Sequence, residues 1–186
     1  MLDKISFDAN AIYKELALAQ TTGMNVLRAV LQYAVYADDP VYFLKTLDKF
    51  LSICDKHHIK MVPALFDDCL FGINSDPKIG KQPEPLKGWY AWAWSPSPGH
   101  SMVTDTTTYP KLTAYVKAMI SRFKNDKRIL FWDLYNEPTN GGLGSTTFPL
   151  LKKVIATARE VNPSQPLSVE VWNGDKRLNE IVFAAW

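Results

Sequence analysis

Residues 129–140, "ILFWDLYNEPTN", begin as a continuous apolar run and end on the polar sequence Asn136-Glu137-Pro138. Such a short apolar run predicts a strand that is buried on both faces, as in a parallel sheet. Polar residues that directly follow a parallel strand lie at the edge where barrel enzymes carry their chemistry. Glu137 is therefore a candidate catalytic carboxylate, and Pro138 is expected to hold it in extended backbone.

Helical patterns and short apolar runs alternate along the rest of the chain. Helices are predicted over residues 8–22, 40–54, 112–123, 148–161 and 176–186, and strands over residues 24–33, 60–68, 128–135 and 166–172. Asp39 and Pro40 illustrate the helix signals, since they supply a cap and a first-turn proline. The order α-β-α-β-α-β-α-β-α implies an α/β fold with parallel strands joined by right-handed crossovers.

Two architectures fit this order. A doubly wound sheet often carries a glycine-rich phosphate loop after its first strand, but "LQYAVYADDP" at residues 31–40 contains no glycine. A (β/α)8 barrel collects polar residues after its strands, and this chain has such residues: Asp67, Asp68, Asn136, Glu137, Asn173 and Asp175. We therefore favour the barrel.

Composition indicates a globular domain and excludes several kinds of partner. The 186 residues are 47% hydrophobic and 22% charged, and 21 basic against 19 acidic residues give a net charge of +2. The basic residues are scattered, which argues against nucleic acid as a partner. No apolar stretch approaches the roughly 20 residues needed to cross a membrane. Cys54 and Cys69 match neither a disulfide framework nor a zinc spacing, so we interpret both as packing residues and expect no metal or cofactor.

Glu137 has two possible roles. A carboxylic acid in a partly dry, aromatic-lined site can serve as a proton donor, and the neighbouring amide of Asn136 can bind a substrate hydroxyl. Alternatively, Glu137 is an acidic residue near a helix N-terminus, as is common in turns between a strand and a helix. Position alone does not decide between them.

Arg28 interrupts the first apolar strand. A buried arginine needs a carboxylate partner, and we expect this partner to be Asp133 or Glu170.

The segment 72–109 is rich in Gly, Pro, Ser and Trp and is too long for an ordinary connection. Its aromatic residues Trp89, Tyr90, Trp92 and Trp94 are expected either to form a platform for sugar rings or to pin the loop onto the barrel. His100 lies at the end of this segment and is a candidate substrate contact.

Three further candidates follow predicted strands. Asp67 and Asp68 are expected either to bind sugar hydroxyls or to cap the loop, and Trp172 ends its strand beside them. His57 and His58 precede a strand, which places them on the opposite face of a barrel. They are therefore poor ligand candidates.

The motif "WDLYNEP" resembles the fourth strand of the two-glutamate (β/α)8 glycoside hydrolases, the superfamily that contains the family 5 cellulases and mannanases. The resemblance implies that Glu137 is the general acid/base and that Asn136 binds a sugar hydroxyl. "GMNVLRAVL" looks like the second strand, whose arginine, here Arg28, supports the nucleophile. Arg28 is therefore also a candidate substrate-site residue, a role that only the family resemblance of its strand implies. "VPALFDDCLFG", "GKQPEPLKGW" and "WSPSPG" are similar to a bacterial group labelled cellulase or xylanase.

This resemblance implies that residues 1–186 form a single incomplete barrel domain with about four strands, numbers 2 to 5. Strand 1 and strands 6 to 8, including the nucleophilic glutamate of strand seven, have no counterpart here. The chain alone is expected to be inactive and to self-associate or pair with the other part of a barrel. Export to the periplasm or medium is implied only by the family.

The leading functional hypothesis is hydrolysis of β-linked polysaccharide or oligosaccharide with retention of configuration. The alternative is a carbohydrate-binding fragment without turnover. A Schiff-base aldolase is disfavoured because no lysine lies at a strand end, since Lys60 begins its strand.

Overall fold

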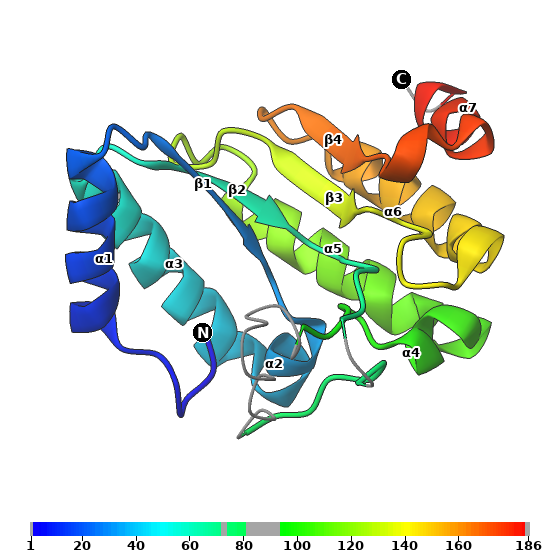
Figure 1. The fold of residues 1–186 in the computed structure, drawn as a ribbon, viewed down its shortest axis with the longest axis horizontal. Helices are drawn as coiled ribbons and strands as arrows, with labels where there is room; N and C mark the ends of the chain where they lie inside the picture. The colour runs from blue at the N-terminus through cyan, green and yellow to red at the C-terminus, as the bar shows by residue number, and fades with distance from the viewer. Residues whose placement is uncertain (1, 72–73, 81–93, 185–186) are drawn as a thin grey trace.

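The computed structural model describes residues 2–71, 74–80 and 94–184 (Figure 1). Its strands form one sheet in the order β1-β2-β3-β4, with all neighbouring pairs parallel. The strands are β1 (Val26–Val30), β2 (Lys60–Ala64), β3 (Trp132–Asn136) and β4 (Leu167–Glu170). Each strand therefore lies beside the next strand in sequence, as in consecutive units of a barrel, and the predicted α/β class is confirmed.

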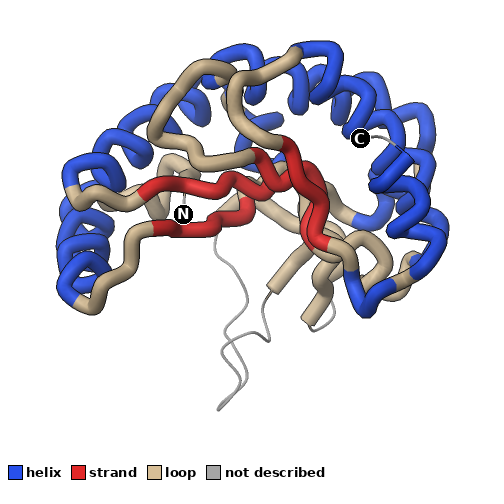
Figure 2. Tube along the Cα trace, turned by 90° about the horizontal axis from the view of Figure 1, so that it is seen from above, coloured by secondary structure: helices blue, strands red, loops and turns tan. Residues whose placement is uncertain are grey.

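The long helices lie in an arc on one side of the sheet (Figure 2). They are α1 (Ala9–Thr21), α3 (Pro40–Lys56), α5 (Tyr109–Phe123), α6 (Phe148–Val161) and α7 (Lys176–Ala184). Asp39 accepts a hydrogen bond from the Tyr42 amide at 3.0 Å and so caps α3, as its sequence position predicted. All five long helices agree with the predicted ones within a few residues at each end.

Two short helices were not predicted. They are α2 (Tyr33–Asp38), which follows β1, and α4 (His100–Thr104), which lies in the long segment before α5. Short 3-10 turns also occur, at η1 (Thr106–Thr108), η2 (Gly144–Thr147) and η3 (Trp172–Gly174). Helices of one or two turns cannot show a hydrophobic period, which explains why the sequence pattern did not indicate them.

The core fills the space between the sheet and the helical arc. Its largest buried side chains come from strands and helices alike and include Phe43, Phe50, Phe66, Tyr115, Phe123, Trp132 and Tyr135. In β1, Leu27 and Ala29 pack against this core, which leaves the alternate residue Arg28 on the opposite face. That face of the sheet is the one on which the candidate catalytic residues are found.

Both outer edges of the sheet lack a strand partner among the described residues. β1 pairs only with β2, and β4 pairs only with β3. In the described part of the chain, no helix is both long and apolar enough to cross a membrane.

Candidate active site

Segments that follow β2 and β3 meet at the carboxyl edge of the sheet. The amide of Asp68 donates to the carbonyl of Asn136 at 3.1 Å, and the amide of Asn136 donates to the carbonyl of Phe66 at 2.8 Å. The amide of Glu137 donates to the carbonyl of Glu170 at 3.0 Å, next to the end of β4. Glu137 therefore directly follows a parallel strand at the edge expected from the sequence.

An irregularity in β3 places Asp133 and Asn136 on the same face. Asp133 pairs with Ser168 and Asn136 with Glu170, so an advance of three residues along β3 matches an advance of two residues along β4. In a regular strand, residues three apart face opposite sides, and one extra residue restores a common side. This bulge allows one guanidinium, that of Arg28, to reach both side chains.

Arg28 forms an ion pair with Asp133, one of the two partners expected from the sequence; Asp133 is fully buried, whereas the Arg28 side chain is 37% exposed. Its Nε donates to Asp133 Oδ2 at 3.0 Å, and its Nη2 contacts the same oxygen. Burial raises the pKa of Asp133 to about 6, although the charge of Arg28 acts in the opposite direction. The nearby charge of Glu170 adds to the increase in the pKa of Asp133.

The side-chain amide of Asn136 has one orientation that satisfies all of its neighbours. Its oxygen accepts from Arg28 Nη2 at 2.5 Å, and its nitrogen donates to Asp67 Oδ1 at 2.6 Å. Because a donor lies on one side and a carboxylate on the other, a flipped amide would face two repulsive contacts. Asn136 is therefore locked beside Glu137 by Arg28 and Asp67.

The backbone of Glu137 is not extended, so the sequence expectation for this residue was wrong. Its φ is +46°, in the left-handed region, and Thr139 also has a positive φ, of +91°. The amide of Asn140 donates to the carbonyl of Glu137 at 3.0 Å, which closes a tight turn around Pro138. The contacts that hold this turn outweigh the local preference of a residue before proline.

Glu137 is also not a helix N-terminal acid. The next α-helix, α6, begins only at Phe148, after the η2 turn. The side chain of Glu137 is instead half-buried among groups at the ends of β2 and β3.

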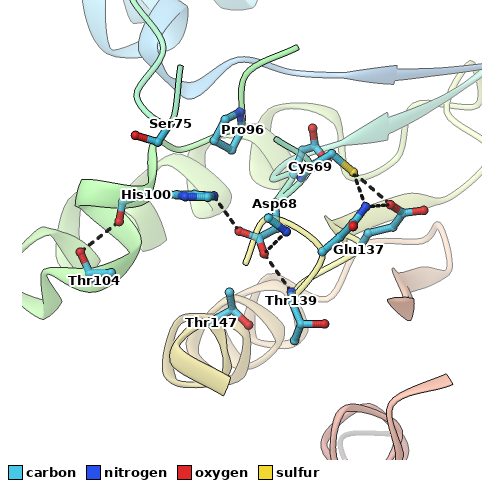
Figure 3. A network of polar contacts seen from close by, with 12 residues as sticks. Asp68, Cys69, Ser75, Pro96, His100, Thr104, Glu137, Thr139 and Thr147 are labelled. Carbon is cyan, nitrogen blue, oxygen red and sulfur yellow. Dashed lines mark hydrogen bonds and ion pairs between the residues drawn. The ribbon is translucent and has the colours of Figure 1, made fainter. Parts of the chain in front are cut away.

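Two residues that sequence reasoning did not select contact the carboxylate of Glu137 (Figure 3). The thiol of Cys69 lies 3.0 Å from Oε2, and the side-chain nitrogen of Asn140 donates to the same oxygen at 2.7 Å. Cys69 was interpreted as a packing residue, and it is buried, but it also belongs to this polar network. No local sequence pattern indicates this contact, because Cys69 and Glu137 lie 68 positions apart.

Asp67 and Asp68 are both fully buried, at 0% exposure. Asp67 accepts from Asn136 and the Cys69 amide through Oδ1, and from the Trp94 indole through Oδ2 at 2.5 Å. Of the two roles left open by the sequence, these contacts favour holding the loops over binding sugar hydroxyls.

Asp68 holds the turn that carries Glu137. Its Oδ2 accepts from the backbone amides of Thr139 and Gly141, at 3.0 Å each. Its Oδ1 lies 3.2 Å from His100 Nε2, at the start of α4 (Figure 3). Gly141 is required here, because a Cβ at this position would lie 2.0 Å from the Asp68 carbonyl oxygen.

His100 is directed at Asp68 and not at open space. The hydrogen bond with Asp68 raises the pKa of His100, and burial opposes this increase. His100 therefore has a partner within the protein, and its contact with substrate stays a prediction.

The structure describes two of the four tryptophans that were predicted to contact substrate. Trp94 is 43% exposed, with its indole nitrogen fixed by Asp67, and Trp172 is 41% exposed after β4. Trp89 and Trp92 lie outside the described residues. The two candidate indoles that are described, Trp94 and Trp172, thus present an apolar surface near the strand ends.

Metal ligation finds no support in the described ranges, which contain no group of three or more His, Cys, Asp or Glu able to hold an ion. His57 is buried near the opposite end of the sheet, where its Nδ1 lies 3.1 Å from Gln20 Oε1.

The sequence model of a known family matches nearly the whole chain. The family is described as Cellulase (glycosyl hydrolase family 5), and the match covers residues 11–182. No curated protein matches the chain.

Several solved structures share the fold. The Streptomyces cattleya GH5_18 complex with GlcNAc has a TM-score of 0.60 at 12% identity, over 90% of this chain and 40% of that chain. The exo-beta-1,4-mannosidase Op5Man5 from Opitutaceae bacterium strain TAV5 has a TM-score of 0.60 at 17% identity, over 87% and 28%. The endo-1,4-beta-mannanase from Rhizomucor miehei has a TM-score of 0.61 at 13% identity, over 90% and 53%. This chain therefore spans between 28% and 53% of these three structures, and the likeness concerns the fold.

Proposed function

Since the chain belongs to the cellulase family, glycosyl hydrolase family 5, we propose that it supplies the acid/base half of a site that hydrolyses β-linked glycosides. The observation that carries this proposal is the position of Glu137, directly after β3 and half-buried, with its carboxylate held by neighbours. Asn136 beside it is the proposed contact for a sugar hydroxyl.

The substrate class is a β-1,4-linked glucoside or mannoside. Structures with this fold include an endo-1,4-beta-mannanase and an endoglucanase, which share 13% and 14% identity with the chain. The exposed faces of Trp94 and Trp172 suit the apolar faces of pyranose rings. Both sugars present such faces, so the proposal extends to either.

Glu137 acts as the proton donor in the first step. As the bond between the anomeric carbon and the glycosidic oxygen breaks, its electron pair goes to the oxygen, which takes the proton of Glu137. In a retaining enzyme a second carboxylate, about 5 Å from the first, attacks the anomeric carbon.

We assign this second carboxylate to residues outside 1–186. Among the described carboxylates at this edge, Asp67 and Asp68 are fully buried and Asp133 is paired with Arg28. Glu170 lies within β4, near enough to Asp133 for its charge to raise the pKa of that carboxyl group. Asp175 accepts from the amides of Arg177 and Leu178 and so caps α7. Residues 1–186 then form one incomplete barrel domain, whose open β1 and β4 edges pair with the rest of a barrel or with a second copy.

An added nucleophile tests the acid/base role without the missing carboxylate. Azide can attack the anomeric carbon of a β-1,4-linked trisaccharide while Glu137 protonates the leaving oxygen, which yields an α-glycosyl azide and a shorter sugar. We expect cleavage that depends on azide in the wild-type chain, and cleavage slower by about 100-fold or more in Glu137→Gln. The matched control is Glu180→Gln, on the exposed surface of α7.

The outcomes separate the two functional hypotheses. Sugar binding without azide-dependent cleavage would select the non-catalytic carbohydrate-binding fragment. Rapid hydrolysis without azide that is lost in Glu137→Gln would support Glu137 as the acid. It would, however, overturn the assignment of the nucleophile to another part of the protein. Neither binding nor cleavage would contradict the proposal as a whole.

A further inference from the structure

We propose that Cys69 and Asn140 are positioning residues that hold Oε2 of Glu137, so that the transferred proton resides on Oε1. This inference rests on the proposed acid/base role of Glu137. It assigns separate tasks to the two oxygens of one carboxyl group. Neither Cys69 nor Asn140 needs to contact the sugar in this role.

Oε2 receives two donors from two different segments. The Asn140 side-chain nitrogen lies 2.7 Å from Oε2 and comes from the turn after β3. The Cys69 sulfur lies 3.0 Å from the same oxygen and comes from the segment after β2. Because the two donors come from separate segments of the chain, they fix the orientation of the Glu137 carboxyl group (Figure 3).

Oε2 of Glu137 is the acceptor that lies 3.0 Å from the Cys69 sulfur, and the carboxylate of Asp67 is a second acceptor near the thiol. The sulfur accepts from the side-chain nitrogens of Asn136 and Asn140, at 3.3 and 3.4 Å. The backbone amide of Cys69 donates to Asp67 Oδ1 at 3.1 Å, which fixes the position of the side chain. A thiol has one hydrogen, and both oxygens of Asp67 already accept from other donors, Oδ1 from Asn136 and the Cys69 amide and Oδ2 from the Trp94 indole. The thiol hydrogen is therefore assigned to Oε2 of Glu137, 3.0 Å from the sulfur.

The position of the catalytic proton follows from this arrangement. A carboxylic acid carries one hydrogen, and an oxygen that already receives two donor hydrogens cannot also carry it without repulsion. The acid form of Glu137 therefore has its O–H at Oε1 and its carbonyl oxygen at Oε2. When the proton leaves Oε1, both bonds to Oε2 persist, so the carboxylate does not rotate between the two steps of the reaction.

The environment of Cys69 is consistent with a thiol that stays protonated. Burial raises its pKa, and the hydrogen bond to Glu137 and the charge of Asp67 raise it further. These two carboxylates are the charged groups that face the sulfur in the described residues. A neutral thiol is the form that can donate.

The S–H stretching band in Raman spectra tests the bond directly and does not require turnover. A Cys54→Ala background leaves one thiol in the chain, since Cys54 and Cys69 are its two cysteines. We expect the Cys69 band to lie at the low frequency of a thiol bonded to a carboxylate, and to move up in Glu137→Gln. Glu180→Gln in the same background should leave the band in place.

An unchanged S–H band in Glu137→Gln would overturn the inference, whatever the activity of the chain.

A kinetic experiment uses azide-dependent cleavage and two variants of Cys69. Cys69→Ser retains a hydrogen-bond donor, and Cys69→Ala removes it. We expect Cys69→Ala to lower the rate about tenfold with an altered pH profile, and Cys69→Ser to restore most of it. Absence of azide-dependent cleavage in the wild type would refute the proposed function. The Raman result would still show whether the Cys69 thiol donates to Glu137.

Discussion

Several of the residues that shape the candidate site are buried carboxylates with assigned partners. Asp67 joins Asn136 to the Trp94 indole, and Asp68 joins His100 to two backbone amides of the turn after Glu137. A buried charge of this kind is stable only when its oxygens have donors. These contacts therefore explain how a turn with a left-handed Glu137 is maintained.

The contact between Asp68 and His100 predicts a dependence of stability on pH. Asp68 raises the pKa of His100, so the folded protein binds this proton more tightly than the unfolded chain. The stabilisation is fully present below the ordinary value of 6.5 and is lost as pH rises through the raised pKa. We expect the free energy of unfolding, measured with urea, to fall across this range in the wild type.

In His100→Gln this part of the pH dependence should disappear, and Asp68→Asn should remove it as well. Asp133 titrates in a different window, because its pKa rises from 3.8 to about 6 on folding. Its contribution is present below pH 3.8 and is lost toward pH 6. An identical slope above pH 6.5 in the wild type and in His100→Gln would show that the two side chains do not interact.

The residues of the site were only partly predictable from the sequence. Glu137, Asn136 and Arg28 could be selected because each lies on, or directly after, a recognisable strand. Cys69 and Glu137 lie 68 positions apart in the chain, and no local sequence pattern indicates a contact over such a separation. The left-handed φ of Glu137 was also not predictable, because its turn is held by a tertiary contact, in which Asp68 accepts from the amides of Thr139 and Gly141.

At the level of elements, helix ends depend on capping side chains. Asp39 caps α3 through the Tyr42 amide and also contacts Lys4 at 2.8 Å. We expect Asp39→Ala to lower the free energy of unfolding by about 1 kcal/mol, since a backbone donor loses its partner. Denaturant unfolding followed by circular dichroism measures this change.

The adjacent residue provides a matched control for the cap. Asp38 carries the same charge and lies 4.0 Å from Lys4, but it is not the cap of α3. Asp38→Ala should therefore change stability by less than about 0.5 kcal/mol. Equal losses in the two variants would mean that charge, and not capping, is responsible.

Elements with enough length were predicted well, and the reason is physical. Helix α3 has 17 residues with one apolar face, so its period is visible in the sequence. Helices α2 and α4 have six and five residues, which is too short for a period to appear. The bulge in β3 has no sequence signal either, because it arises from pairing with β4.

At the level of the whole molecule, the main feature is a sheet with two open edges. β1 exposes Val26, at 42%, beside a backbone edge that has no strand partner in the described part of the chain. Unpaired edges of parallel sheets favour association with other strands. We expect sedimentation velocity to show association of the chain that increases with concentration.

A charged residue on the edge should weaken this association. Val26→Lys places a charge beside the open strand, and the matched control Val41→Lys places one on α3, where the side chain is 79% exposed. We expect the first variant to shift the distribution toward monomer and the second to leave it unchanged. A wild-type chain that stays monomeric at all concentrations would refute pairing with a second copy.

The most direct test of the central claim is the dependence of the Glu137→Gln defect on the leaving group. A proton donor matters when the leaving oxygen is basic, as in a sugar, and matters little for dinitrophenolate, which leaves without a proton. In azide-dependent cleavage we therefore predict that Glu137→Gln slows the release of a sugar by about 100-fold or more, and the release of dinitrophenolate by less than about threefold. Equal losses for both substrates, or no loss for either, would contradict the role of Glu137 as the acid.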